Sequence, residues 1–461
     1  MLWNIRGAFI VNCQRVRQLS GAPFVARENG LRSEIVIVGG GAGGLELACK
    51  LGRKLGASKV MLVDSRLYHI WKPSLHEVAA GTLDIHQEGL SYQMLAHDNG
   101  FTFVYGALVG LDQAQKRLTV GPITLAQEEV LPERRIGYAK LVLAVGSTSN
   151  YFGVPGAAEH TISLNATEDA ERFRLRLLRL LAAADQNKSG GREGSVDIVI
   201  IGGGATGVEL AAELREASRV YASYGFEHLD ALRDVRITLL EGAPRILAPL
   251  PERVAGAALS LLQERHISVV TGCKVTSIEP GRVLDADGHA YPADLCVWAA
   301  GIRAPELLST LGLPTGRGGQ LEVDGWLRVK GAEHIYALGD CAACIDRNGQ
   351  AVPPRAQAAH QQADFLRRTF LLAARGKPPP AKAYAYTDYG SLVSVGSTTT
   401  VGSLMGALRG FSWFVEGFFA RLMYQSLHLM HHRAVLGTLR TSLLAIARFL
   451  IRRTTPLVKL H

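Results

Sequence analysis

Two glycine-rich turns are the clearest chemical signal in this sequence. Residues 34–46 read EIVIVGGGAGGLE, and residues 197–209 read DIVIIGGGATGVE. Each copy is a β-branched apolar run, then a G-x-G-x-x-G turn, then helix-forming residues, which predicts a buried strand, a tight turn and a helix. The glycines of the two turns are Gly39, Gly41 and Gly44 in the first copy and Gly202, Gly204 and Gly207 in the second.

Glycines at this spacing suit the binding of a dinucleotide. The first glycine makes a tight turn, the second lets the backbone approach a pyrophosphate, and the third lets the helix pack closely on the strand. The pyrophosphate then lies at the N–H-rich end of the helix. One such turn is a weak signal, but its repetition in a matching context predicts two dinucleotide sites.

A carboxylate follows each turn at the end of the next strand-like run. Asp64 lies 20 residues beyond Gly44, where it can accept hydrogen bonds from both hydroxyls of an adenosine ribose. Glu241 lies 34 residues beyond Gly207, and we attribute the longer spacing to an extended helix and loop near residues 221–228. Because a carboxylate repels a 2′-phosphate, we expect the second site to prefer NADH over NADPH.

Two dinucleotide sites in one chain suggest FAD in one and NADH in the other, and therefore hydride transfer. Later apolar segments return to the first site: one closes on Gly146, and another ends at Asp340, whose side chain can bind the ribityl hydroxyls of a flavin. The run at 295–301 closes on Gly301 and plays the same part for the second site. We therefore assign FAD to the first turn and NADH to the second.

The predicted fold is α/β with two Rossmann-like domains. The length of 461 residues, 48% of them hydrophobic and 20% charged, excludes a single small module and a disordered chain. We expect a FAD domain at 34–160 and 325–400, an NADH domain at 161–324, a dispensable extension at 1–33, and a C-terminal amphipathic segment at 401–461.

The positive charge lies at the two ends of the chain. The formal net charge is +9, of which residues 1–33 carry +4 and residues 401–461 carry +7, so the body is at −2. Nucleic acid is the competing explanation, but the basic residues of the last segment alternate with apolar ones, which suits a lipid headgroup layer better. No stretch approaches 18 apolar residues, so no transmembrane helix is expected.

The stretch from Arg433 to Arg453 predicts a helix lying in the plane of an anionic membrane, and the alternative is a dimerisation helix. On a 3.6-residue wheel its basic and apolar side chains separate onto opposite sides. The basic side carries Arg433, Arg440, Arg448 and Arg452, and the apolar side carries Val435, Leu439, Leu443, Ile446 and Leu450.

The cysteines and histidines predict neither disulfides nor a metal site. Six cysteines in this length do not form a disulfide framework, which indicates a reducing compartment. Cys341 and Cys344 have the spacing of a redox motif, but we favour a packing role beside the flavin. The 14 histidines show no zinc spacing, and we interpret residues 430–433 (MHHR) as an interfacial helix face.

The whole arrangement resembles the two-dinucleotide-binding flavoproteins and, in detail, the type II, non-proton-pumping NADH:quinone oxidoreductases of bacterial respiratory chains. The resemblance runs from about residue 34 to the last residue. It is carried by the segments 69–81 (HIWKPSLHEVAAG), 202–214, 298–305, 339–342, 353–361 (PPRAQAAHQ) and 458–461. It implies NADH oxidation coupled through FAD to reduction of a membrane quinone, by a peripheral protein on the cytoplasmic face of the inner membrane.

The resemblance also implies roles for particular residues. Lys72 is expected to bind the cofactor, and Gln357 and Gln361 fit the quinone-site pattern Ala-Gln-x-Ala-x-Gln. These two amides are four residues apart, hence on one helical face, and can hydrogen-bond a quinone carbonyl. Glu209 is expected near the nicotinamide and the quinone entrance, where it guides protons.

Rival functions remain open at this point. Related disulfide reductases carry their redox pair near residues 70–80, and this chain has no cysteine there. A sulfide:quinone oxidoreductase would need reactive cysteines beside the flavin, and a soluble reductase acting on a protein carrier would not need the amphipathic tail. A third class is a flavoprotein that binds NADH without turnover.

Overall fold

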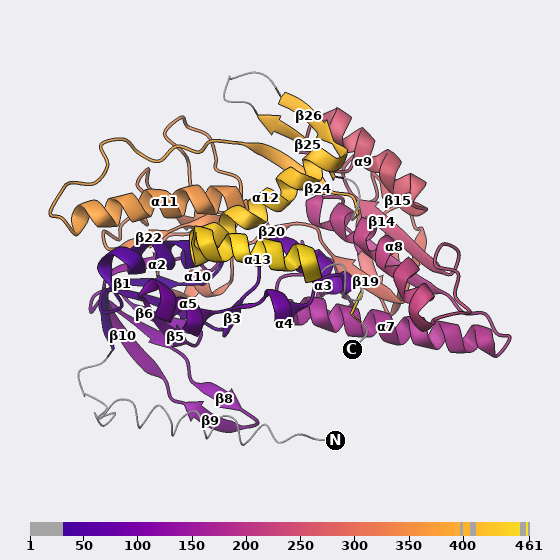
Figure 1. The fold of residues 1–461 in the computed structure, drawn as a ribbon, viewed down its shortest axis with the longest axis horizontal. Coiled ribbons are helices and arrows are strands. Elements are labelled where there is room, and N and C mark those ends of the chain that lie inside the picture. Colours follow the sequence, from indigo (N-terminus) through magenta and orange to yellow (C-terminus); the bar gives the residue numbers. More distant parts are fainter. Residues whose placement is uncertain (1–30, 397–399, 406–411, 452–457, 460–461) are drawn as a thin grey trace.

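Two sheets lie side by side, each with helices on its faces (Figure 1); the first is mixed and the second is wholly parallel. The computed structural model describes residues 31–396, 400–405, 412–451 and 458–459. Most of the expected N-terminal extension, the side chain of Arg452 and the last two residues lie outside the described part of the chain.

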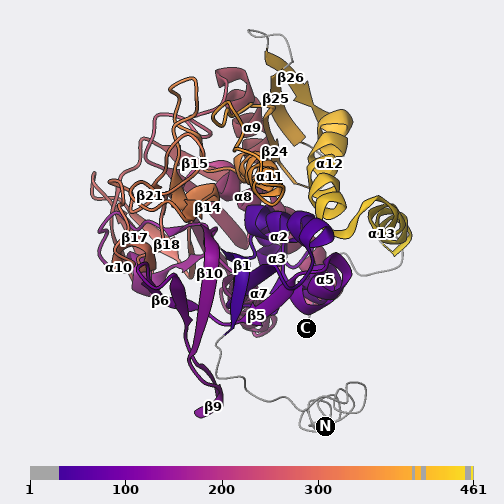
Figure 2. The same cartoon turned by 90° about the vertical axis from the view of Figure 1, so that its left-hand side faces the viewer.

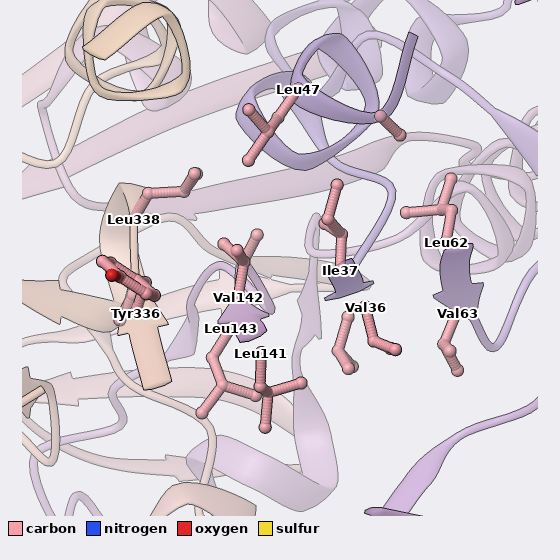
Figure 3. Close-up of a cluster of buried hydrophobic side chains, with 14 of the residues drawn as sticks. Val36, Ile37, Leu47, Leu62, Val63, Leu141, Val142, Leu143, Tyr336 and Leu338 are labelled. Carbon is pink, nitrogen blue, oxygen red and sulfur yellow. The ribbon is translucent and has the colours of Figure 1, made fainter. Parts of the chain in front are cut away.

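The apolar run before the first glycine turn forms the central strand of the first sheet. β1 pairs in parallel with β2 and β10, so that Ile37 lies opposite Leu62 and Val142. Side chains on both faces of these strands are buried (Figure 3), as expected for a sheet covered on both sides. The strands, in sheet order, are β5 (Thr102–Tyr105), β2 (Val60–Asp64), β1 (Arg32–Val38), β10 (Arg134–Leu143), β7 (Arg117–Val120) and β6 (Leu108–Asp112), with β22 (Ile335–Ala337) also paired to β10.

The second apolar run has the corresponding position in a wholly parallel sheet. Ile200 of β13 lies between Leu239 and Val297 on the neighbouring strands, and all three side chains are buried. The strands, in sheet order, are β12 (Ile162–Ser163), β19 (Leu295–Trp298), β13 (Val196–Ile201), β14 (Val235–Glu241) and β15 (Ile267–Thr271).

Each glycine turn opens a helix that packs on its own sheet. Around the first sheet lie α2 (Ala42–Leu55), α5 (Tyr92–Asn99) and α11 (Ala356–Ala373), and around the second lie α7 (Thr167–Ser189), α8 (Ala205–Gly225) and α9 (Glu252–Glu264). The short α3 (Leu75–Ala80) contacts α7 and α8, and the Tyr221 hydroxyl donates to the Ala80 carbonyl at 2.8 Å. Because strand, turn and helix follow one another at the same spacing in both copies, both turns lie at the carboxyl ends of their central strands.

Smaller elements complete the framework. They are β3 (Tyr68–His69), η1 (Lys72–Ser74), α4 (Ile85–Glu88), β4 (Leu90–Ser91), β8 (Ile123–Leu125), β9 (Glu128–Leu131), β11 (Thr148–Ser149), α6 (Ala157–His160), β16 (Val275–Glu279), β17 (Gly281–Asp285), β18 (Ala290–Ala293), β20 (Ile302–Arg303), α10 (Leu307–Thr310), β21 (Leu321–Glu322), η2 (Gly339–Cys341) and β23 (Ala342–Ala343).

The packing differs from the expected domain boundaries at both ends of the inserted domain. Ala157 belongs to the buried cluster of the second sheet although it precedes residue 161. The chain returns to the core of the first sheet by Ala304, Leu308 and Leu321, before residue 325. A single sequence pattern marks strands well, but it does not show on which core a connecting segment packs.

The C-terminal segment is not helical throughout. It begins with an antiparallel sheet of β24 (Gly390–Ser394), β25 (Thr400–Met405) and β26 (Ser412–Glu416), and Val401 is buried in the core of the second sheet. Two helices follow, α12 (Gly417–Leu436) and α13 (Thr438–Ile451), separated by Gly437 with φ +84°. Figure 2 shows the sharp change of direction between them.

The expected helical wheel therefore needs a correction. The helix that we expected to run from Arg433 is broken at Gly437, so Arg433 and Val435 belong to α12. Val435 is fully buried. The arginines of α13 also face the protein: Arg440 binds Asp98, and Arg448 binds Glu88. Apolar side chains of α13 are exposed, with Leu439 at 75% and Ile446 at 59%, and the Arg440 side chain is 56% exposed beside its ion pair.

The end of the described chain returns to the junction of the two sheets. The Lys459 backbone N–H donates to the Gly81 carbonyl at 2.8 Å, and its ammonium binds Asp84 at 3.1 Å. Among the described helices, none combines the length and the apolar character needed to cross a bilayer.

Candidate functional site

The two glycine turns have the same backbone geometry. Gly39 and Gly202 have φ of +102° and +113°, a region that disfavours side chains. A Cβ on Gly44 would lie 1.9 Å from the Gly39 carbonyl oxygen, and a Cβ on Gly207 would lie 1.9 Å from that of Gly202. The third glycine of each turn is therefore required for helix and strand to pack this closely.

The second glycine of each turn borders open space. A Cβ on Gly41 or on Gly204 would meet no atom within 4 Å, although both residues begin helices of the interior. Neither α2 nor α8 has a side-chain cap at this end, so the first backbone N–H groups point at the same open space. Both turns thus fit a bound pyrophosphate, which would take these N–H groups as donors.

The carboxylates of Asp64 and Glu241 occupy equivalent positions. Asp64 accepts the Gly40 backbone N–H at 2.6 Å, and Glu241 accepts that of Gly203 at 2.5 Å. Burial raises the pKa of Asp64, and hydrogen bonds from the backbone N–H groups of Gly40 and Arg66 oppose that shift. Each carboxylate stands at the end of its strand beside the turn, as the ribose-binding role requires.

A polar cluster lies where the later strands return to the first turn. The Ser147 hydroxyl donates to Asp340 at 2.7 Å, and the Lys72 ammonium donates to the Ser147 carbonyl at 3.2 Å. The surrounding protein lowers the pKa of Lys72, and the charge of Asp340 opposes this. The sequence-predicted residues Lys72 and Asp340 are therefore brought together, at the carboxyl end of β10 and beside Gly146, which has φ +70°.

The carboxyl edges of the two sheets meet directly. β11 after the first sheet pairs with β20 after the second, with Thr148 opposite Arg303. The Asn150 backbone N–H donates to the Gly301 carbonyl at 3.2 Å, and the Trp298 indole N–H donates to the Asn150 carbonyl at 2.9 Å. Since dinucleotides bind outside the carboxyl ends of such strands, the two candidate sites face a shared region.

Glu209 lies at this junction, on the helix of the second turn. Its carboxylate accepts the Ser394 backbone N–H at 3.1 Å and approaches Nδ1 of the buried His76 at 3.7 Å. Burial lowers the pKa of His76 to about 4, so the imidazole is neutral at pH 7. The structure thus places Glu209 between the two sheets, already bound to β24.

Gln357 and Gln361 hold the chain segment 387–390. The Gln357 amide donates to Asp388 at 3.2 Å and to the Gly390 carbonyl at 3.1 Å. Gln361 exchanges both hydrogen bonds with the backbone of Thr387, donating at 2.8 Å and accepting at 3.0 Å. The two amides share one face of α11 as expected, but in this structure they bind protein rather than facing open space.

Cys341 and Cys344 are both buried in the core of the first sheet. The Cys341 thiol contacts the carbonyl oxygens of Leu338 and Leu143 at 3.2 and 3.4 Å. Burial raises the pKa of Cys341 to about 11 and that of Cys344 to about 12, which disfavours the thiolate needed for redox chemistry.

A buried hydrogen-bond chain links the first turn to α12. His69 Nδ1 lies 3.0 Å from the Gly40 carbonyl, and its Nε2 lies 2.9 Å from Nε2 of His431. His431 Nδ1 lies 2.9 Å from Glu46, which also binds His360 at 2.6 Å and Lys50 at 2.9 Å. All but His360 and Lys50 are nearly inaccessible to solvent.

The partners determine the protons in this chain. A carbonyl only accepts, so His69 carries its proton on Nδ1 and offers a lone pair on Nε2. His431 then donates from Nε2 to His69, and its Nδ1 shares a hydrogen bond with the Glu46 carboxylate. Burial alone would raise the pKa of Glu46, but hydrogen bonds from His360 and His431 and the charge of Lys50 outweigh it and hold that pKa well below its usual range.

These residues correct one interpretation and show what the sequence did not reveal. His431 and His432 are each only 2% exposed, so the two histidines are not part of an interfacial face, whereas Met430 and Arg433 of the same segment are exposed. The buried network of Glu46, His69 and His431 was missed, because His431 is more than 350 residues away from the other two in the sequence. The only local signal was that His69 begins one of the segments carrying the family resemblance.

Comparisons with known proteins agree with this geometry. The model of the pyridine nucleotide-disulphide oxidoreductase family matches residues 33–363. A type II NADH:quinone oxidoreductase of Haemophilus influenzae is 39% identical over 444 residues, which cover 93% of this chain and 99% of that protein.

Two solved structures share the fold. NDH2 of Plasmodium falciparum, solved in complex with NADH, aligns with a TM-score of 0.77 at 18% identity and covers 93% of this chain and 100% of that one. The sulfide:quinone oxidoreductase of Aquifex aeolicus aligns with a TM-score of 0.68 at 19% identity, covering 92% and 96%. The fold is therefore common to several chemistries, and the sequence relationship decides among them. The chain belongs to the pyridine nucleotide-disulphide oxidoreductase family and, within it, to the type II NADH:quinone oxidoreductases.

Proposed function

We propose that this protein oxidises NADH and passes both electrons, through FAD, to a membrane quinone without pumping protons. The observation that carries the proposal is the meeting of the two carboxyl edges through β11 and β20, which brings two equivalent dinucleotide turns to one region. The family relationship supports the same reaction. FAD, when bound, supplies the hydride acceptor and the two-electron donor that the side chains lack.

The first turn is the FAD site, and the second is the NADH site. The cluster of Lys72, Ser147 and Asp340 lies beside the first turn and offers an ammonium, a hydroxyl and a carboxylate to the flavin and its ribityl chain. Asp64 and Glu241 accept the ribose hydroxyls of FAD and NADH respectively. The carboxylate of Glu241 also repels a 2′-phosphate and so selects NADH.

Gln357, Gln361 and Glu209 control the quinone side. The two amides hold residues 387–390 against α11, and a quinone carbonyl that replaces Thr387 or Asp388 as their partner would bind without introducing a fixed charge. Glu209 lies at the junction and can exchange a proton with quinone or with water. The segment 387–390 is then the part of the site that must adjust when quinone binds.

The outer face of α13 is the membrane-contacting surface. Leu439, Leu443, Ile446 and Leu450 are all more than half exposed along one side of this helix, while Arg440 and Arg448 bind the protein body. Burying such side chains in the interfacial layer stabilises binding by roughly 1.5–3 kcal/mol each. This arrangement supports a peripheral membrane protein, for which we propose the cytoplasmic leaflet, and a homodimer formed through the same face is the alternative.

Anaerobic addition of NADH to the purified yellow protein tests the reaction. We expect rapid bleaching of the flavin absorbance and recovery when a ubiquinone or menaquinone analogue is added. Recovery only with a disulfide or a protein carrier would instead support a soluble reductase. Reduction by sulfide in place of NADH would support a sulfide:quinone oxidoreductase, a reaction that the high pKa values of Cys341 and Cys344 disfavour.

Membrane contact has its own test. Truncation before Gly406 would release the protein but would also remove the buried His431 and Val435 of α12. A full-length variant with Leu443→Glu and Ile446→Glu should move the protein to the soluble fraction while FAD stays bound, without removing any contact of the arginines. If that variant still sediments with membranes, the outer face of α13 is not the anchor.

A further inference from the structure

Glu88, His428 and His432 form a compact cluster that the reaction above does not use. Glu88 ends α4, and the two histidines are four residues apart on α12, hence on one face of that helix. Their candidate ligand atoms all lie within 4.8 Å of one another. Arg448 of α13 reaches this cluster and binds Glu88.

Hydrogen bonding already orients one of these histidines as a ligand. His432 Nδ1 lies 3.0 Å from the backbone carbonyl of His428. Because the carbonyl only accepts, Nδ1 carries the proton and Nε2 presents its lone pair to the cluster. This is the arrangement in which metal-binding histidines are usually held, with the second ring nitrogen donating to a carbonyl or carboxylate.

A cation already contacts two of the three side chains. The Arg448 guanidinium binds Glu88 and lies 3.4 Å from Nε2 of His432. A carboxylate and a neutral imidazole therefore converge on one positive group. A small cavity of about 10 Å³, room for one water-sized atom, is lined by the same three side chains together with Trp71 and Ser74.

We propose that Glu88, His428 and His432 bind a divalent transition metal ion in competition with Arg448. Two imidazole nitrogens and one carboxylate oxygen, with water as the fourth ligand, form a set that suits Zn²⁺ and Cu²⁺ and is poor for Mg²⁺ or Ca²⁺. Tetrahedral Zn²⁺ with bonds of about 2.1 Å needs ligand atoms about 3.4 Å apart, so the three side chains must close in by about 1 Å.

Metal binding at this cluster releases one anchor of α13. Arg448 must leave Glu88 when the ion enters, while Arg440 stays bound to Asp98 near the other end of the helix. The carboxyl-terminal half of α13 then loses its ion pair with the body. Metal binding at the cluster therefore weakens the attachment of α13 to the protein body. This inference does not depend on the electron acceptor of the proposed reaction.

Zn²⁺ titration of the chelator-stripped holoprotein, with a competing chromophoric chelator, tests the site. We expect one Zn²⁺ per chain. His428→Ala and His432→Ala should each weaken binding by about 100-fold, as loss of a ligand usually does at least as much as loss of an outer partner. Arg448→Gln should tighten binding, because the competing cation is gone.

Matched controls separate this cluster from other histidines and acids. His86→Ala, on the same helix as Glu88 but exposed, should leave Zn²⁺ affinity unchanged. So should His289→Ala, which removes a member of the surface group Asp285, Asp287 and His289. Flavin absorbance and melting temperature confirm that each variant is folded.

Two further measurements keep the inference open to refutation. Electron paramagnetic resonance of added Cu²⁺ should show coupling to two imidazole nitrogens in the parent and to one in His428→Ala. Hydrogen exchange of residues 445–451 should rise on addition of Zn²⁺ in the parent but not in His432→Ala. Unchanged Zn²⁺ affinity in both histidine variants, or weaker binding in Arg448→Gln, would overturn the proposal.

Discussion

The two glycine turns share one backbone and differ in what holds them. In the first, the Gly40 carbonyl accepts the Tyr92 hydroxyl at 2.8 Å and His69 Nδ1 at 3.0 Å. In the second, the Gly203 carbonyl accepts only a backbone donor among the described contacts, the Leu247 N–H at 2.8 Å. Side-chain hydrogen bonds thus connect the Gly40 carbonyl of the first turn to α12, whereas a backbone N–H holds the Gly203 carbonyl of the second turn. Such a difference suits a resident cofactor in one site and an exchanging substrate in the other.

Replacing the third glycine of each turn gives the largest expected effect. Gly44→Ala places a Cβ 1.9 Å from a carbonyl oxygen, so the helix must shift away from its strand. We expect a colourless protein without activity. Gly207→Ala should stay yellow but should no longer bleach with NADH, as measured by flavin absorbance after gel filtration. The opposite pattern would reverse the assignment of the two sites.

Removing the charge of Glu46, in the network beside the first turn, should lower the free energy of unfolding by several kcal/mol. Glu46→Gln removes the buried carboxylate that Lys50, His360 and His431 bind, and breaking a buried charge pair typically costs about 3–5 kcal/mol. Because the folded pKa of Glu46 lies below its ordinary 4.5, the carboxylate stabilises the fold above that pH and loses this effect as the pH falls. The difference in melting temperature between parent and variant should therefore be full at pH 7 and shrink below pH 4.5.

The ribose carboxylate of the second turn should set the choice of nucleotide. Glu241→Gln removes a charge that would face the 2′-phosphate of NADPH, so the ratio of kcat/KM for NADPH to that for NADH should rise about 10–100-fold. Steady-state kinetics with both nucleotides measure this. Asp64→Asn is the matched control in the first turn, where it should alter flavin retention and leave the ratio unchanged.

The smallest expected effect concerns the side-chain anchor that only the first turn has. Tyr92→Phe removes the hydroxyl bound to Gly40 and leaves His69 in place. Loss of one such hydrogen bond costs about 0.5–1.5 kcal/mol, so the rate of flavin release should rise about two- to tenfold. Dilution followed by fluorescence of released flavin reports the rate. An equal change in the KM for NADH would contradict the idea that Tyr92 supports the first turn without affecting the second.

The sequence pattern correctly predicted the features that depend on interactions within short segments of the chain. The buried strands, the six turn glycines and the positions of Asp64 and Glu241 follow from side-chain period, positive φ and close packing within short segments. The family resemblance then supplied the reaction, and the sequence comparison confirmed the family.

What the sequence did not reveal depends on contacts between distant segments. The helical wheel separated a basic face from an apolar one, but it does not show which face turns inward. Arg440 meets Asp98 and Arg448 meets Glu88 across more than 300 residues of chain, so the charges are used within the protein. The burial of His431 has the same origin, since its partners Glu46 and His69 belong to the opposite end of the sequence.

Gly437 has a geometric consequence for the whole enzyme. If α12 continued in a straight line, the residues of α13 would extend about 20 Å away from the protein body. The left-handed conformation at Gly437 folds it back, so that a single flat hydrophobic strip runs tangentially to the molecule. The membrane contact proposed above would then hold the enzyme side-on against a planar surface, at one defined tilt, and not at the end of an extended helix.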